Sequence, residues 1–206
     1  MTEFNVATKE NPKVDNFYVL EESSFCSRLC LGTIHDFKMT MSEGPTAGGK
    51  KVALFDRPLA CPLHQMKCCC FQSLTVTDGE NNSPLGSVKE TFYFCVPEFA
   101  VRNETGEISH FIHMPICCGC LPNICAEGCC RVPFYIYKAD DREKEAGKIV
   151  KIWGSLYTEL MGMHQFECDF PPDATPQQKA VFSGATFLIN ELFFRAKDNN
   201  STPIDG

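Results

Sequence analysis

One segment near the C-terminus constrains the fold more than any other part of the chain, because it has the pattern of a helix without a polar face. From Thr175 the sequence runs TPQQKAVFSGATFLINELFFRAK, with Thr175 and Gln178 at capping-box spacing and Pro176 at the first helical position. The stretch from Ala180 to Phe194 is apolar on nearly all sides. The pattern predicts a helix over residues 176–196 that is buried all round.

The helix could be buried in protein or in lipid. Its apolar stretch spans about 22 Å at about 1.5 Å per residue, which is short of a hydrocarbon core about 30 Å thick. Glu191 would also cost a few kcal/mol inside lipid. A transmembrane span stays open as an alternative. The favoured prediction is a helix threaded through a β-barrel, whose interior it fills with five apolar side chains. These are Phe182, Phe187, Leu188, Leu192 and Phe193.

Upstream of the helix, short runs rich in Val, Ile, Phe and Tyr alternate with turn residues, as expected of half-buried strands. The fold prediction is therefore mainly β, an antiparallel barrel of ten or more strands closed around the helix. The expected domain spans residues 14–197, with a flexible N-terminus at 1–13 and a flexible tail at 198–206. The candidate strands are Phe17–Glu21, Asp36–Met41, Lys51–Phe55, Ser73–Thr77, Gly86–Lys89, Thr91–Cys95, Phe99–Arg102, Ile108–Ile112, Val132–Tyr137, Ile149–Trp153 and Phe166–Phe170.

The net charge and the lack of catalytic motifs argue against several classes of function. The first thirteen residues lack a secretory signal pattern, so a cytosolic chain with reduced thiols is expected. A net charge of −7 argues against binding nucleic acid, or an anionic membrane, through bulk electrostatics. Membrane contact would need a hydrophobic or covalent anchor. No catalytic motif accompanies the scattered histidines, and His110 and His113 are expected on opposite faces of one strand. An enzyme is therefore not predicted.

The chain carries fourteen cysteines, most of them in two clusters. Cys68, Cys69 and Cys70 stand beside Phe71, which suits S-acylation, whereas a β-bulge with inert thiols is the alternative. The second cluster could bind a tetrahedral zinc or form a loop of free thiols, because its spacings are irregular. The four candidate zinc ligands are Cys118, Cys120, Cys125 and Cys129.

Five motifs in order resemble the phospholipid scramblase family, from about Phe17 to Arg195. They are FCSRLCLG, FDRPL ahead of the cysteine triplet, MPICCGC, GKIVKIWG, and FECDFPPD followed by the apolar helix. The resemblance implies a tubby-like barrel of about twelve strands around the C-terminal helix. It also implies a palmitoylated protein on the cytoplasmic face of a membrane, with the plasma membrane as the favoured location. The implied activity is ATP-independent, bidirectional and calcium-activated movement of phospholipid between leaflets, with Cys68, Cys69 and Cys70 as the lipidation sites.

The calcium segment departs from the family pattern. Gly162 and His164 stand where the family has acidic residues, which leaves Glu167, Asp169 and Asp173 as the calcium ligands. Because calcium prefers six to eight oxygen ligands, only weak binding is expected. GKIVKIWG has been linked to nuclear import in some relatives. The alternative is an ordinary barrel strand with Trp153 in the core.

Two functions follow as hypotheses. The first is a divergent, membrane-associated scramblase-like protein whose partner is the phospholipid membrane. The second is an acyl-anchored or zinc-stabilised interaction module without transport activity.

Overall fold

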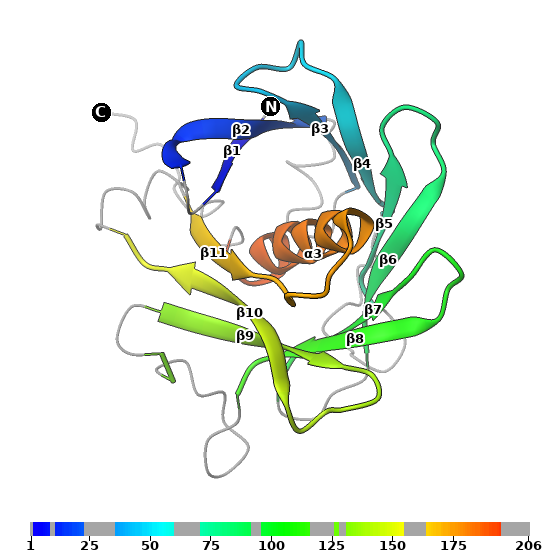
Figure 1. The fold of residues 1–206 in the computed structure, drawn as a ribbon, viewed down its shortest axis with the longest axis vertical. Helices are drawn as coiled ribbons and strands as arrows, with labels where there is room; N and C mark the ends of the chain where they lie inside the picture. Colours follow the sequence, from blue (N-terminus) through cyan, green and yellow to red (C-terminus); the bar gives the residue numbers. More distant parts are fainter. Residues whose placement is uncertain are drawn as a thin grey trace, which may run out of the picture.

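Eleven strands form one antiparallel sheet in which strands adjacent in sequence are also adjacent in space, from β1 at one edge to β11 at the other. The computed structural model describes residues 2–8, 11–22, 36–59, 71–91, 96–115, 126–127, 131–154 and 164–194, with side chains from residue 17 onward. Figure 1 shows the sheet curling around the helix α3. The strands are β1 (Thr2–Thr8), β2 (Asn11–Glu22), β3 (Phe37–Glu43), β4 (Lys51–Arg57), β5 (Ser73–Asp78), β6 (Pro84–Glu90), β7 (Glu98–Arg102), β8 (Ile108–His113), β9 (Arg131–Lys138), β10 (Glu145–Ile152) and β11 (Gln165–Asp169).

The connections between strands alternate between two rims of the sheet, because every neighbouring pair is antiparallel. We call one the hairpin rim. It carries the short connections after β3, β5, β7 and β9, together with the turn from β11 into α3. We call the other the loop rim. It carries the connections at residues 23–36, 58–72, 91–97, 114–130 and 153–164, of which all but 91–97 are longer than any connection on the hairpin rim.

The helix α3 (Pro176–Ile189) continues into a π-helical turn, η3 (Asn190–Phe194). The expected capping box is present. The Thr175 side chain accepts a hydrogen bond from the Gln178 backbone N–H, and the Gln178 side chain accepts one from the Thr175 N–H. Pro176 occupies the first turn, where its missing N–H costs no intrahelical bond. Local sequence signals therefore determine where the helix begins.

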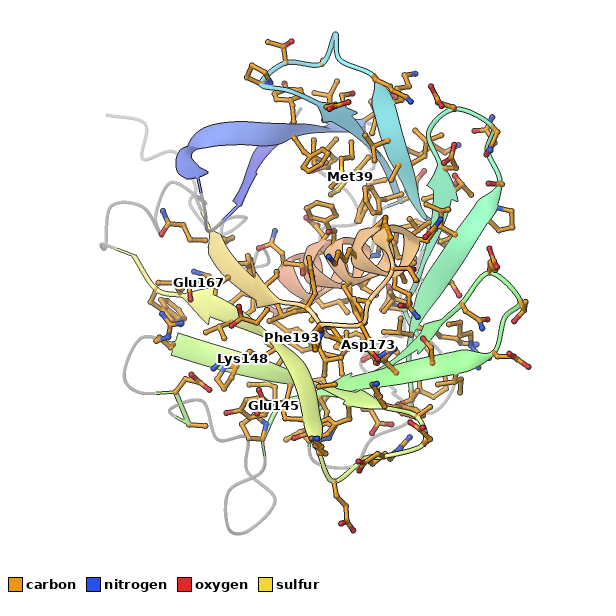
Figure 2. The ribbon with its side chains drawn as sticks, viewed as in Figure 1. Met39, Glu145, Lys148, Glu167, Asp173 and Phe193 are labelled. Atoms are coloured by element: carbon orange, nitrogen blue, oxygen red, sulfur yellow. The ribbon has the colours of Figure 1, made fainter. Side chains whose placement is uncertain are left out.

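The helix runs from the hairpin rim to the loop rim inside the curve of the sheet. Near its start, Phe182 contacts the His110 ring edge-to-face, at 5.1 Å between centroids. Farther along, Phe187 meets Phe55 at 5.1 Å, and Phe193 meets Phe99 at 6.2 Å. Figure 2 shows Met39 and Phe193 within this interior. The predicted core side chains are confirmed, with Phe182, Phe187 and Leu188 buried and Leu192 and Phe193 partly buried against the core.

Within the described residues, no helix is long and apolar enough to cross a membrane.

Alternating side chains along each strand pack on this helix. In β3, Phe37, Met39 and Met41 are buried, and in β4 Ala53 and Phe55 are buried at the paired positions. This period of two is what a sheet covered on one face requires. A single core joins sheet and helix, as predicted.

Two expectations differ from the structure. Residues 1–13 were expected to be flexible, but Thr2–Thr8 form β1 and pair with β2, which already begins at Asn11. Trp153 was expected in the core. It follows the last residue of β10 and is 39% exposed, because the alternation that buries Ile149 and Lys151 stops with the strand. The candidate strand Thr91–Cys95 falls largely outside the described residues, as does the predicted tail at 198–206.

Candidate functional site

The calcium candidates lie on β11 and in the turn after it. Phe166, Cys168 and Phe170 pack against the core, so the alternation turns Glu167 and Asp169 to the other face of the strand. These two carboxylates therefore share a face, as the sequence predicted. Asp169 pairs in register with Lys148 of β10.

Basic side chains hold the first and last of the three candidates. Arg131 donates to Glu167 Oε2 at 2.6 Å, and this hydrogen bond raises the pKa of the Arg131 guanidinium above its ordinary value. Lys138 Nζ donates to Asp173 Oδ2 at 2.5 Å, and that bond lowers the pKa of the Asp173 carboxyl. Each of these two carboxylates is thus paired with a cation of the protein itself.

These two pairs lie at opposite ends of β9, which runs from Arg131 to Lys138. The Cα atoms of Arg131 and Lys138 lie seven residue steps apart along the strand, about 23 Å at about 3.3 Å per residue. Figure 2 shows Glu167 and Asp173 at separate places. Since calcium binds its ligands at about 2.3–2.6 Å, Glu167 and Asp173 cannot share one ion in this arrangement. Among the described residues, no three His, Cys, Asp or Glu side chains are grouped to hold a metal.

A small polar cluster lies on the outer face of β9 and β10, beside these carboxylates. Glu127 Oε1 accepts from Lys148 Nζ at 2.8 Å and from the Tyr135 hydroxyl at 3.2 Å. Burial, with the Glu127 charge next in size, raises the pKa of Tyr135 to about 12. Tyr135 therefore stays protonated at neutral pH and acts as a donor to Glu127.

The cysteine candidates Cys68, Cys69 and Cys70 and the zinc candidates Cys118, Cys120, Cys125 and Cys129 lie outside the described residues. Their sequence positions fall in the connections from β4 to β5 and from β8 to β9, both at the loop rim. The described cysteine, Cys168, is partly buried, with its Sγ 3.4 Å from Thr186 Oγ1 on α3. Both metal binding and acylation stay predictions.

A feature that the sequence reasoning missed is a set of buried ionisable side chains inside the sheet near the loop rim. Four of the strands that run toward this rim each carry one buried ionisable side chain at their last or next-to-last residue, and η3 carries the fifth. Each is at most 2% exposed. We call them the inner charged set: Glu21, Arg57, Glu90, Lys151 and Glu191.

Hydrogen bonds join part of this set. Arg57 Nη2 donates to Gln72 Oε1 at 2.8 Å, and the Gln72 backbone N–H donates to Glu90 Oε2 at 3.2 Å. Lys151 Nζ donates to the Ile152 carbonyl at 2.8 Å and lies 5.2 Å from the centre of the Trp153 ring. Burying such groups is costly unless they are paired and hydrogen-bonded. The set makes the loop-rim end of the interior polar, in contrast to the apolar centre.

Strand parity is the signal that would have revealed this set. Glu21 lies two residues after buried Val19, Arg57 two after Phe55, and Glu90 two after Val88. A period of two therefore places all three on the inner face.

Comparisons with known proteins cover nearly the whole of this arrangement. The family model described as Scramblase matches residues 3–196. Phospholipid scramblase 2 of Bos taurus is 31% identical over 86% of this chain and 57% of its own length. Phospholipid scramblase 1 of Homo sapiens is 31% identical over 87% of this chain and 53% of its own length, and that of Mus musculus is 28% identical over 89% and 52%.

The chain thus spans little more than half the length of the curated relatives it matches. No solved structure gives a significant match. The family model spans both the sheet and the helix that fills it, and so the chain belongs to the phospholipid scramblase family as a distant member.

Proposed function

We propose that this protein is a membrane-associated scramblase-like protein that moves phospholipid between leaflets in both directions without ATP. The observation that carries the proposal is the family match over residues 3–196, which includes every described element of the sheet and helix. The inner charged set adds physical support. A phospholipid headgroup is ionic, and Arg57, Lys151 and Glu90 are polar groups that an otherwise apolar interior would not need.

The second part of the proposal is attachment to the cytoplasmic face of a membrane, with the plasma membrane as the favoured location. Cys68, Cys69 and Cys70 are the palmitoylation sites, since two or more acyl chains provide the stable anchoring that a single chain lacks. The sheet closes into a barrel in this proposal, so that the edges β1 and β11 do not stay open to pairing with other chains.

The proposal includes calcium activation, but only with weak binding of the calcium ion. Glu167 and Asp169 share a face, and Arg131, which is ion-paired with Glu167, competes with calcium for that carboxylate. Calcium would have to displace Arg131 from Glu167, so any activation requires calcium concentrations well above those of high-affinity sensors.

Reconstitution tests the transport claim. Purified acylated chain is placed in liposomes that contain fluorescent phospholipid, and an impermeant reductant bleaches the outer leaflet with and without calcium. We expect the protected inner-leaflet signal to decay faster than in empty vesicles. Decay equal to that of empty vesicles, with the chain shown to be membrane-bound, would refute transport and favour the acyl-anchored interaction module.

A matched variant separates attachment from transport. Replacing Cys68, Cys69 and Cys70 by Ala removes the proposed anchor while leaving every described side chain in place. We expect this variant to leave the membrane fraction of cells. Zinc analysis of the same preparations tests the other cluster, because one zinc per chain that is lost on Cys120→Ser and Cys125→Ser would support a zinc-stabilised module.

A further inference from the structure

Three neighbouring strands each carry a buried polar side chain on the inner face of the sheet. Arg57 is the last residue of β4, Gln72 directly precedes β5, and Glu90 is the last residue of β6. Figure 1 shows these strands side by side next to α3. Besides the side-chain bonds described above, the Glu90 N–H donates to the Gln72 carbonyl at 2.8 Å. The three side chains therefore stand together at one end of the interior.

The helix brings two more polar side chains to the same place. Phe187 of α3 contacts Phe55 of β4, with 5.1 Å between the ring centroids. Asn190 and Glu191 follow Phe187 by three and four residues, which places them on the same helix face. Arg57 follows Phe55 by two residues of strand, about 6.6 Å, while one helical turn advances about 5.4 Å. Because both elements run toward the loop rim, Asn190 and Glu191 reach the depth of Arg57.

Two amide atoms at this site have unused hydrogen-bonding capacity. Arg57 can only donate, so the oxygen of the Gln72 amide faces it and the NH2 group is left over. Within the part of the chain that the structure describes, Gln72 Nε2 and Asn190 Oδ1 have no hydrogen-bond partner, although the two side chains are only 2% and 4% exposed. Buried amides are nearly always hydrogen-bonded. A ligand that satisfies both atoms must accept from one and donate to the other.

The neighbouring charges indicate which chemical groups such a ligand carries. Gln72 Nε2 stands beside the Arg57 guanidinium, which suits a phosphate oxygen. Asn190 Oδ1 stands beside the Glu191 carboxylate in sequence, which suits an ammonium N–H. The ethanolamine headgroup of a phospholipid has both groups, two carbon atoms apart. A choline headgroup has the phosphate, but its quaternary nitrogen has no N–H and would leave the Asn190 oxygen without a donor.

We infer that Gln72 and Asn190 form a headgroup site that prefers phospholipids with a primary ammonium group to those with a quaternary one. The inference rests on the proposed lipid transport and names its substrate class. Asn190 also begins the π-helical turn η3, and such turns are frequent at functional sites. Since the side chains of the site are at most 4% exposed, a headgroup reaches them only when this end of the interior opens.

Two short-chain lipids allow a direct test. The full-length chain is titrated calorimetrically with dihexanoyl-phosphatidylethanolamine and dihexanoyl-phosphatidylcholine, each kept below its micelle-forming concentration. These ligands differ only by three N-methyl groups. We expect the ethanolamine lipid to bind at least fivefold more tightly. Free phosphoethanolamine, which has no acyl chains to contact the apolar interior, should bind at least tenfold more weakly than the ethanolamine lipid; equal binding would assign the site to a soluble ligand and overturn the lipid assignment.

Variants assign the preference to the two amides. Asn190→Leu removes the acceptor at similar volume and should reduce the preference to less than twofold, with the choline lipid unaffected. If it does not fold, Asn190→Asp keeps an acceptor and should retain the preference. Gln72→Glu keeps an oxygen toward Arg57 but removes the N–H donors, so both lipids should bind at least fivefold more weakly. Gln177→Leu, at an exposed amide in the first turn of α3, should change neither affinity.

The outcomes separate this inference from the proposed function. Equal affinity for the two lipids overturns the inference, and so does a preference that survives Asn190→Leu or is lost in Asn190→Asp. Binding of neither lipid also overturns it, and would mean that the amides bind only water. Leaflet exchange together with equal affinities would retain transport and remove only the preference. A preference without leaflet exchange supports the site and removes only the transport claim.

Discussion

A substitution at Gly184 tests whether α3 packs inside the sheet, because this glycine lies where the helix touches β4 and β5. A Cβ built at Gly184 would lie 2.9 Å from Leu74 Cδ2, 3.0 Å from Val76 Cγ2 and 3.2 Å from Phe55 Cδ1. These separations are shorter than ordinary carbon contacts of about 3.5–4.0 Å. The neighbours must move to admit even one methyl group.

The magnitude follows from two opposing terms. Alanine in a helix interior is favoured over glycine by about 1 kcal/mol, whereas overpacking a filled core costs about 1–3 kcal/mol. Gly184→Ala should therefore lower the free energy of unfolding by about 1 kcal/mol net. Gly184→Val adds two more carbons at the same contact and should lower it by roughly 3 kcal/mol.

Urea denaturation followed by circular dichroism measures both variants. Ser183→Ala is the control, since the Ser183 hydroxyl donates only to the Lys179 carbonyl of the same helix, at 3.0 Å, in an exposed position. It should change stability by less than about 0.5 kcal/mol. If Gly184→Ala instead stabilised the protein by about 1 kcal/mol, the helix would not be packed against β4 and β5, and the reasoning would be refuted.

Three further predictions address other parts of the molecule. Burial lowers the pKa of His110 below 6.5, with Asp173 opposing it, so its neutral form favours the folded state above pH 6.5 and stability falls as pH drops below that value. His110→Phe should flatten this acid slope in denaturation midpoints measured from pH 7 to 5, and an unchanged slope would contradict the assignment. Arg57→Leu removes the charged donor to Gln72 and should cost about 1.5–3 kcal/mol, with Arg57→Lys costing less; equal losses in urea titrations would show that the hydrogen bond is not the source. Calorimetric titration should give a calcium dissociation constant of about 10⁻⁴ M or weaker, and micromolar binding that is lost in Glu167→Gln would show that the separated pairs rearrange around the ion.

The helix was predictable because its signals are local. Thr175, Pro176 and Gln178 determine its start within four residues, and the apolar sequence that follows requires burial on all sides. The interior strands were predictable for the same reason, since their alternation is visible within each segment. Ten of the eleven candidate strands overlap observed strands.

The remaining features depend on contacts between distant segments. β1 is a short segment whose composition alone did not mark it as a strand, and it pairs with β2 from Thr2 opposite Glu21 to Val6 opposite Phe17. The separation of Glu167 from Asp173 depends on their partners in β9, which no spacing within the calcium segment indicates. The inner charged set, in contrast, could have been found by continuing the strand parity to the last residue of each strand.

Lipid-phase photolabelling tests most directly whether the helix stays inside the sheet when the protein is attached to a membrane. Acylated chain bound to vesicles that contain a photoactivatable phospholipid is irradiated, digested with trypsin and mapped. Cleavage after Lys151, Lys179 and Arg195 separates Trp153, in the peptide 152–179, from the helix, in the peptide 180–195. We predict almost no lipid adducts in the peptide 180–195. Adducts concentrated in the peptide 180–195 would show that the helix enters the bilayer, and would contradict the account.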